Sequence, residues 1–197
     1  MPPNLAAFVL SAIAASATPG PNNAMVAASS AAHGIRATRS HVLGITFGFA
    51  FMVALVGLGL AGPLAASPSV HGVLRWVGAA WMPWIAFGIA RSAVLPDALP
   101  RPPLSFGAAA LFQWVNPKAW VLAVATAATY TSPAQPLVPQ VLLLAGLFGV
   151  VGVPCTLLWC LIGAGAARVL RTPRQLRVFN LAMAGLLAAS VLPLVFA

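Results

Sequence analysis

Long apolar runs separated by short polar or proline-containing gaps dominate the chain. The runs lie at about 5–32, 42–62, 73–95, 105–130, 138–165 and 177–197. A helix needs about 20 predominantly apolar residues to cross the hydrocarbon core of a bilayer, and each run is long enough. Because backbone polar groups in lipid must be satisfied inside the spanning element, we expect the runs to be helical. The pattern predicts an all-α membrane protein with about six transmembrane helices.

Composition supports a membrane environment for most of the molecular surface. Of the 197 residues, 61% are hydrophobic and 6% are charged, and the mean hydropathy is +0.98. Roughly a quarter of the residues of a soluble domain are charged, so we do not expect a water-exposed surface over most of this protein. The first run has no basic segment before it, unlike a signal peptide, and we expect it to remain part of the protein. We expect a single transmembrane transporter domain over residues 1–197.

The positive charges occur in alternate gaps between the apolar runs. The net charge is +9. The arginines of the gaps after the first, third and fifth runs are Arg36, Arg39, Arg91, Arg101, Arg168, Arg171, Arg174 and Arg177. Cytoplasmic gaps carry such an excess of lysine and arginine. The alternation predicts that these gaps are cytoplasmic and that both termini are periplasmic, and it argues against a nucleic-acid partner.

Two apolar runs contain helix-breaking and polar residues near their middle. The first run is interrupted by Thr18-Pro19-Gly20-Pro21-Asn22-Asn23, and the fourth by Gln113-Trp114-Val115-Asn116-Pro117-Lys118. Proline removes a backbone donor and clashes with the preceding turn, so both helices should open there. Backbone groups freed at membrane depth need protein or a water-filled cavity to satisfy them. We therefore predict a substrate-binding site formed by nine of these residues: Thr18, Pro19, Gly20, Pro21, Asn22, Asn23, Asn116, Pro117 and Lys118.

The two interruptions occupy corresponding positions in the two halves of the chain. Three predicted spans fall within about residues 1–97 and three within about 98–197. An odd number of spans in each half makes the second half inverted relative to the first. Interrupted helices at matching positions of inverted repeats are a sequence indication of a transporter binding site.

The chemistry at the interruptions suits a zwitterionic solute. Pro21 and Pro117 fit the first position of a new half-helix, and Asn116 fits the N-cap before Pro117. The positive ends of both half-helices would then point toward the midplane, where an anion is stabilised. Lys118 adds a full positive charge. Free carbonyl groups near Ala17 and Val115 could receive an ammonium group.

Several of these motifs resemble the LysE/RhtB family of amino-acid exporters. The resemblance rests on the run Thr18-Pro19-Gly20-Pro21-Asn22 with the later Gly44-Ile45 and Gly48, and on Asn116-Pro117-Lys118-Ala119. It implies export of amino acids or related small solutes across the bacterial inner membrane, generally driven by the proton gradient. It implies no catalytic chemistry and no cofactor. A homodimer remains an open possibility.

Other functions remain open from the residues alone. They are export of a cation or another small metabolite and, less favoured, a membrane-embedded enzyme. His33, His41 and His71 are expected at membrane edges, with no acid to orient them. The single acid, Asp97, lies in a gap, so we expect any proton coupling to use Lys118 or His41.

Overall fold

The computed structural model describes residues 4–59, 68–94, 101–170 and 172–190, and within these ranges all regular structure is helical. The helices are α1 (Leu5–Ala17), α2 (Pro21–Gly57), α4 (Pro68–Val94), α5 (Phe106–Val115), α6 (Pro117–Tyr130), α7 (Leu137–Val169) and α8 (Pro173–Ala189). This confirms the predicted all-α class.

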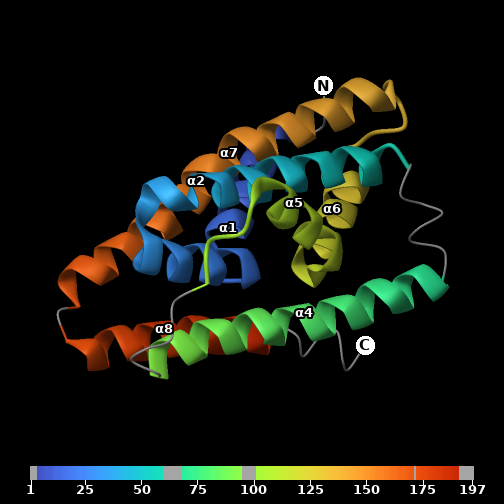
Figure 1. Cartoon of the computed structure of the whole chain (residues 1–197). Coiled ribbons are helices and arrows are strands. Elements are labelled where there is room, and N and C mark those ends of the chain that lie inside the picture. The colour runs from blue at the N-terminus through green and yellow to red at the C-terminus, as the bar shows by residue number, and fades with distance from the viewer. Residues whose placement is uncertain (1–3, 60–67, 95–100, 171, 191–197) are drawn as a thin grey trace.

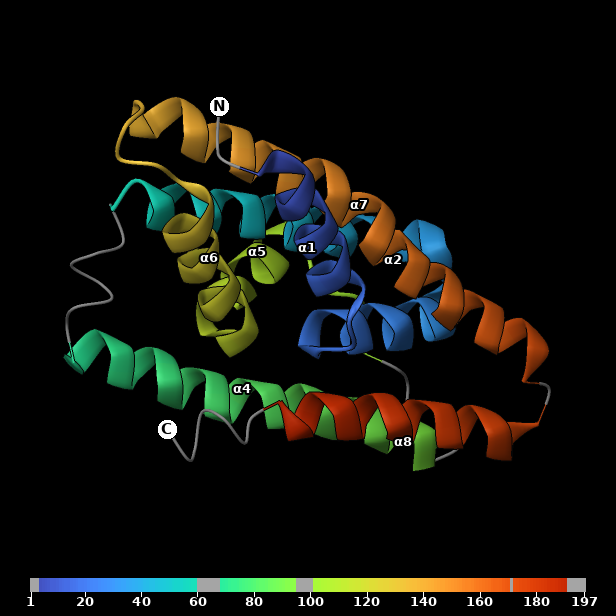
Figure 2. The same ribbon diagram turned by 180° about the vertical axis from the view of Figure 1, so that it is seen from behind.

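Two pairs of long helices enclose three short ones. Figures 1 and 2 show that the second part of α2 lies beside α7 along one edge of the molecule, while α4 and α8 lie side by side along the opposite edge. Helix α2 kinks at Gly34, and its first part lies in the middle of the molecule in both views. The short helices α1, α5 and α6 lie between these pairs in both views. The segments before and after each predicted interruption are therefore held inside a frame of longer helices.

Helix length and polarity fit a membrane protein. Helices α2 and α7 are long and apolar enough to cross a bilayer by themselves. Helices α5 and α6 have 10 and 14 residues, which at a rise of about 1.5 Å per residue gives about 15 and 21 Å, short of the ~30 Å hydrocarbon core. Apolar side chains such as Leu10, Val121 and Val150 are 67–71% exposed. Such a surface is stable against lipid rather than water.

Both predicted interruptions are present. Helix α1 ends at Ala17 and α2 begins at Pro21, while Asn116 alone separates α5 from α6. Pro21 and Pro117 occupy the first turns of α2 and α6. At that position a proline loses no intrahelical hydrogen bond, which explains why the chain resumes a helix directly after each break.

The gap expected between the first two spans is a single residue. Gly34 has φ 79° and ψ 169° inside α2, and the chain is helical on both sides of it. A residue without a Cβ adopts this left-handed φ at little cost, so no longer loop is needed to turn the chain. Arg36 and Arg39 consequently lie on a helix, not in a loop as expected.

A close approach of α2 and α5 holds the site region together. A Cβ added at Gly48 would lie 2.5 Å from the Cα of Ala110, and one added at Gly44 would lie 2.8 Å from the Cβ of Ala109. Small residues spaced four apart allow helix backbones to pack this closely. Gly44 and Gly48 therefore serve the packing of α2 against α5.

Buried apolar side chains join the helices around α2. One cluster brings Met25 of α2 together with Phe112 of α5 and with residues of α4 and α8. A second brings Met52 of α2 against Phe8 of α1 and Phe148 of α7. The part of α2 before Gly34 therefore packs against α4, α5 and α8, and the part after it packs against α1 and α7.

Candidate functional site

A cavity of about 60 Å³ lies where the two interruptions meet. Six of the nine predicted site residues line it: Gly20, Pro21, Asn22, Asn23, Asn116 and Lys118. Helices α2 and α7 supply further lining residues, including Thr46 and Thr156. The tertiary structure thus brings together two segments that are about 100 residues apart in the sequence.

Lys118 connects the two interrupted segments. Its Nζ donates a hydrogen bond of 3.0 Å to the carbonyl oxygen of Thr18. Gly20 lies beside the same side chain, since a Cβ added there would be 3.2 Å from Lys118 Cδ and 3.3 Å from Nζ. The glycine therefore leaves the space that the lysine side chain fills.

The carbonyl groups at the end of α1 already have hydrogen-bond partners. Asn23 Nδ2 donates to the carbonyl oxygens of Ser16 and Thr18, both at 2.9 Å. Trp159 Nε1 donates to the carbonyl oxygen of Ala17 at 3.0 Å. The expectation of free carbonyls near Ala17 is therefore wrong for this conformation. Burial makes an unpaired carbonyl costly, and side chains from α2, α6 and α7 supply the missing donors.

Asn116 caps α6 as expected. Its side-chain oxygen accepts a hydrogen bond of 3.1 Å from the backbone N–H of Lys118, and the side chain is buried. Helix α2 begins at Pro21, beside the same cavity. Two helix N-termini and one ammonium group therefore lie around a single small space, and each favours negative charge.

Four polar residues that line the cavity were not among the predicted site residues: Ser16, Thr46, Gln113 and Thr156. Gln113 is fully buried and exchanges two hydrogen bonds with Asn22, at 2.9 and 3.2 Å. Thr46 Oγ1 is buried with no partner. In the sequence, these residues could have been recognised as polar side chains inside apolar runs. Burying a polar side chain in a membrane costs free energy unless the side chain has a hydrogen-bond partner or a function.

The remaining predicted site residues act through the backbone or lie elsewhere. Thr18, Pro19 and Pro117 are absent from the lining of the cavity, although the Thr18 carbonyl receives Lys118. His41 is 1% exposed and lines a separate cavity. His41 lies in the part of α2 that follows the kink at Gly34, and its position at a membrane edge stays a prediction.

The electrostatic balance of the cavity favours an anion. Lys118 is the one charged side chain among the described residues that line it, and the others are amides, hydroxyls and apolar groups. Apolar side chains of Ile45, Phe49 and Phe148 form one wall. The cavity therefore offers a cation, hydrogen-bonding groups and an apolar surface within a few ångströms of one another.

Known proteins resemble this chain over nearly all of its length. The sequence profile of the LysE type translocator family matches residues 13–195. The "Cysteine/O-acetylserine efflux protein" of Escherichia coli (strain K12) is 32% identical over 179 residues, which cover 90% of this chain and 91% of the relative. The protein of the same name from Shigella sonnei (strain Ss046) matches to the same extent. No solved structure matches the chain.

Proposed function

The chain belongs to the LysE type translocator family, and we propose that it exports a small amino acid or amino-acid derivative across the bacterial inner membrane by alternating access. Members of the family are translocators, so the chain is a membrane transporter and not an enzyme. Export of a cation or another small metabolite is the competing hypothesis. The amino-acid assignment is supported by the relatives, which are named for efflux of cysteine and O-acetylserine.

The observation that carries the proposal is the hydrogen bond between Lys118 and the Thr18 carbonyl. An ammonium group on a carbonyl at a helix break is the contact that the amino group of a substrate would make. The positive ends of α2 and α6 lie beside the same cavity. We infer that the carboxylate of the substrate binds Lys118 and these helix ends. The ammonium group of the substrate then replaces the Lys118 ammonium at the Thr18 carbonyl.

This arrangement favours the binding of a zwitterion over the binding of a simple cation. A carboxylate draws the Lys118 ammonium away from the Thr18 carbonyl, and the substrate ammonium then takes the position that Lys118 leaves. A simple cation would compete with Lys118 without supplying the carboxylate, and like charges would repel it. The apolar wall of Ile45, Phe49 and Phe148 suits a short side chain.

The size of the cavity supports a transport cycle with more than one conformation. Its volume of about 60 Å³ is well below the roughly 300 Å³ at which ligand pockets begin. The helices lining it must therefore separate before a solute binds. The breaks after Ala17 and at Asn116 give the half-helices the freedom to move against the rest of the fold, as in other transporters with broken helices.

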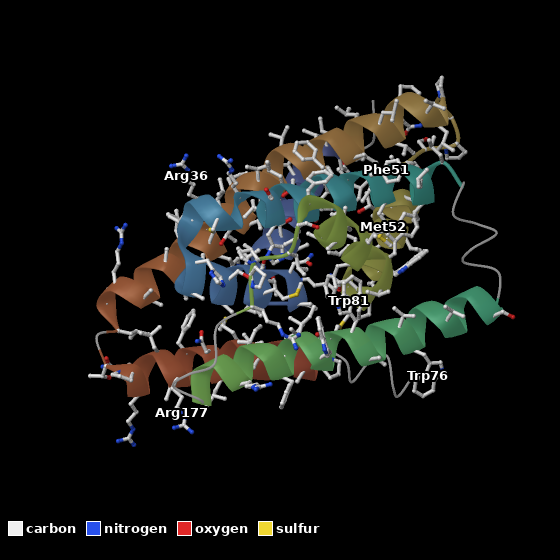
Figure 3. All side chains as sticks on the ribbon, in the orientation of Figure 1. Arg36, Phe51, Met52, Trp76, Trp81 and Arg177 are labelled. Atoms are coloured by element: carbon white, nitrogen blue, oxygen red, sulfur yellow. The ribbon has the colours of Figure 1, made fainter. Side chains whose placement is uncertain are left out.

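We propose six spans arranged as two inverted halves, about 1–97 and 98–197, with both termini in the periplasm. The interrupted spans are α1 with the first part of α2, and α5 with α6. In Figure 3, Arg36 and Arg177 lie toward the same end of the molecule, and Trp76 lies toward the other end. A shared location of arginines supports a cytoplasmic assignment for that end.

We also propose that any proton coupling runs through Lys118 or His41. Both side chains line cavities, and neither cavity contains a carboxylate among its described lining residues. Efflux from proteoliposomes would be measured with and without an imposed pH gradient, for the parent and for Lys118→Met and His41→Gln. A gradient response that survives both substitutions together would contradict this coupling.

Counterflow in proteoliposomes tests the main proposal. Vesicles loaded with unlabelled amino acids are diluted into labelled L-cysteine, O-acetyl-L-serine, L-serine, L-threonine or L-lysine, with choline as a cationic control. We expect uptake of at least one amino acid with a short side chain and none of choline. Exchange of choline without any amino acid would favour the competing hypothesis.

A further inference from the structure

A second and larger cavity lies between α2, α4, α8 and the segment before α5. Its volume is about 450 Å³, which is within the range of small-molecule sites. Most of its wall is apolar, with Met25, Ile85 and Leu104 among the lining residues. Its polar lining residues include His41 of α2, Arg101 of the connecting segment and Asn180 of α8, together with Ser29 and Ser105.

Two of these polar side chains have buried atoms without a protein partner. His41 is 1% exposed, and neither of its ring nitrogens has a hydrogen bond. The Oδ1 atom of Asn180 is also buried without a partner. Unpaired buried polar atoms are costly, and each such atom in a folded protein calls for an explanation. Both residues line the same cavity, so a polar ligand bound there would supply the missing partners once their side chains turn toward it.

Arg101 is fixed in place at the edge of this cavity. Its Cζ lies 3.6 Å from the centroid of the Trp84 ring, and its Nη1 donates to the Trp84 carbonyl oxygen at 3.1 Å. His33 Nε2 donates to the Arg101 carbonyl oxygen at 2.7 Å. Gly88 leaves space for the guanidinium, since a Cβ there would be 2.7 Å from Nε. An arginine held in this way loses little further freedom when it binds a carboxylate.

We propose that this cavity is a second binding site, on the cytoplasmic side, for a small amino-acid zwitterion. Arg101 binds the carboxylate, and Asn180 Oδ1 with an unprotonated ring nitrogen of His41 accepts hydrogen bonds from the ammonium. The inference rests on the proposed export function. Helix α2 lines both cavities.

Binding measurements on the intact protein in lipid nanodiscs test this site. The probes are radiolabelled L-cysteine, kept reduced, and O-acetyl-L-serine. We expect the parent to bind about two molecules per chain, as two occupied cavities require. Arg101→Gln should weaken one class of sites by about tenfold or more, because it removes a charged hydrogen-bond donor.

Gly88→Ala should weaken the same class, because the added Cβ displaces the Arg101 side chain without changing any charge. Gly72→Ala is the matched control on the same helix, where a Cβ meets nothing within 4 Å, and it should bind as the parent does. Lys118→Met should remove the other class and leave the Arg101 class intact.

The outcomes separate the two claims. If the parent binds one molecule per chain, and Lys118→Met loses it while Arg101→Gln keeps it, the second site is wrong and the proposed function stands. Full retention of both classes in Arg101→Gln and Gly88→Ala also overturns the second site. If neither probe binds to the parent nor is transported by it, the proposed function fails, and this inference fails with it.

Discussion

Replacing Lys118 by Met removes the charge from the smaller cavity and keeps the length of the side chain. The parent lysine contacts the Thr18 carbonyl at 3.0 Å. That carbonyl also accepts a hydrogen bond from Asn23 Nδ2 at 2.9 Å. The substitution therefore leaves no buried carbonyl unpaired, and the loss of folding stability should stay below about 1.5 kcal/mol.

The effect on substrate binding should be much larger than the effect on stability. A hydrogen bond to a charged group contributes about 1.5–3 kcal/mol, and about 1.4 kcal/mol corresponds to a tenfold change in affinity. If Lys118 binds the substrate carboxylate, the half-saturating concentration in Lys118→Met should rise roughly 10- to 140-fold. The thermal unfolding temperature should change by only a few degrees.

The assay is counterflow of labelled amino acid in proteoliposomes with equal amounts of reconstituted protein. Arg36→Met is the matched control, because it also removes one positive charge, from an exposed side chain outside the cavity. We expect this control to transport as the parent does. Thermal unfolding in detergent, measured on the same preparations, separates loss of binding from loss of folding.

An unchanged half-saturating concentration in Lys118→Met would refute the carboxylate role of Lys118. A large fall in unfolding temperature together with lost transport would instead show that the lysine serves the fold. Either result would contradict the reasoning from the Thr18 contact.

Three further predictions use the same structure. Gly20→Ala should raise the half-saturating concentration about two- to tenfold, because its Cβ would lie 3.2 Å from Lys118 Cδ, while Gly107→Ala, with nothing within 4 Å, should not. Gly48→Ala should lower the free energy of unfolding by about 1–3 kcal/mol, measured by denaturation in detergent, because its Cβ would lie 2.5 Å from Ala110 Cα. In a cysteine-free background, Arg177→Cys should react with an impermeant maleimide only in inverted vesicles; labelling from outside intact cells would contradict the topology.

The helix interruptions could be predicted because their cause is local. Proline lacks a backbone donor and disfavours helix at the residue before it, so the Pro19-Gly20-Pro21 run and the Asn116-Pro117 pair favour a break. A single proline is not sufficient, since Pro83 and Pro154 lie inside α4 and α7. The same local logic predicted Asn116 as the N-cap of α6. Each of these predictions depends on the residue and its near neighbours alone.

Other features of the sites depend on which segments meet. The polar character of Gln113 is visible in the sequence, but its hydrogen bonds with Asn22 join residues 91 positions apart. The carbonyl groups at the end of α1 accept hydrogen bonds from the side chains of Asn23, Lys118 and Trp159. Nothing local to residues 16–18 indicates that these side chains arrive there.

The sequence by itself determined the membrane class, the helical content and the position of both breaks, because hydropathy, backbone hydrogen bonding and proline geometry act over a few residues. Only the tertiary structure decided that Lys118 lies on the Thr18 carbonyl, that His41 is buried, and that Arg101 and Asn180 line one cavity. Those contacts join helices far apart in the chain. They follow from the packing of whole helix surfaces against one another, which no short stretch of sequence specifies.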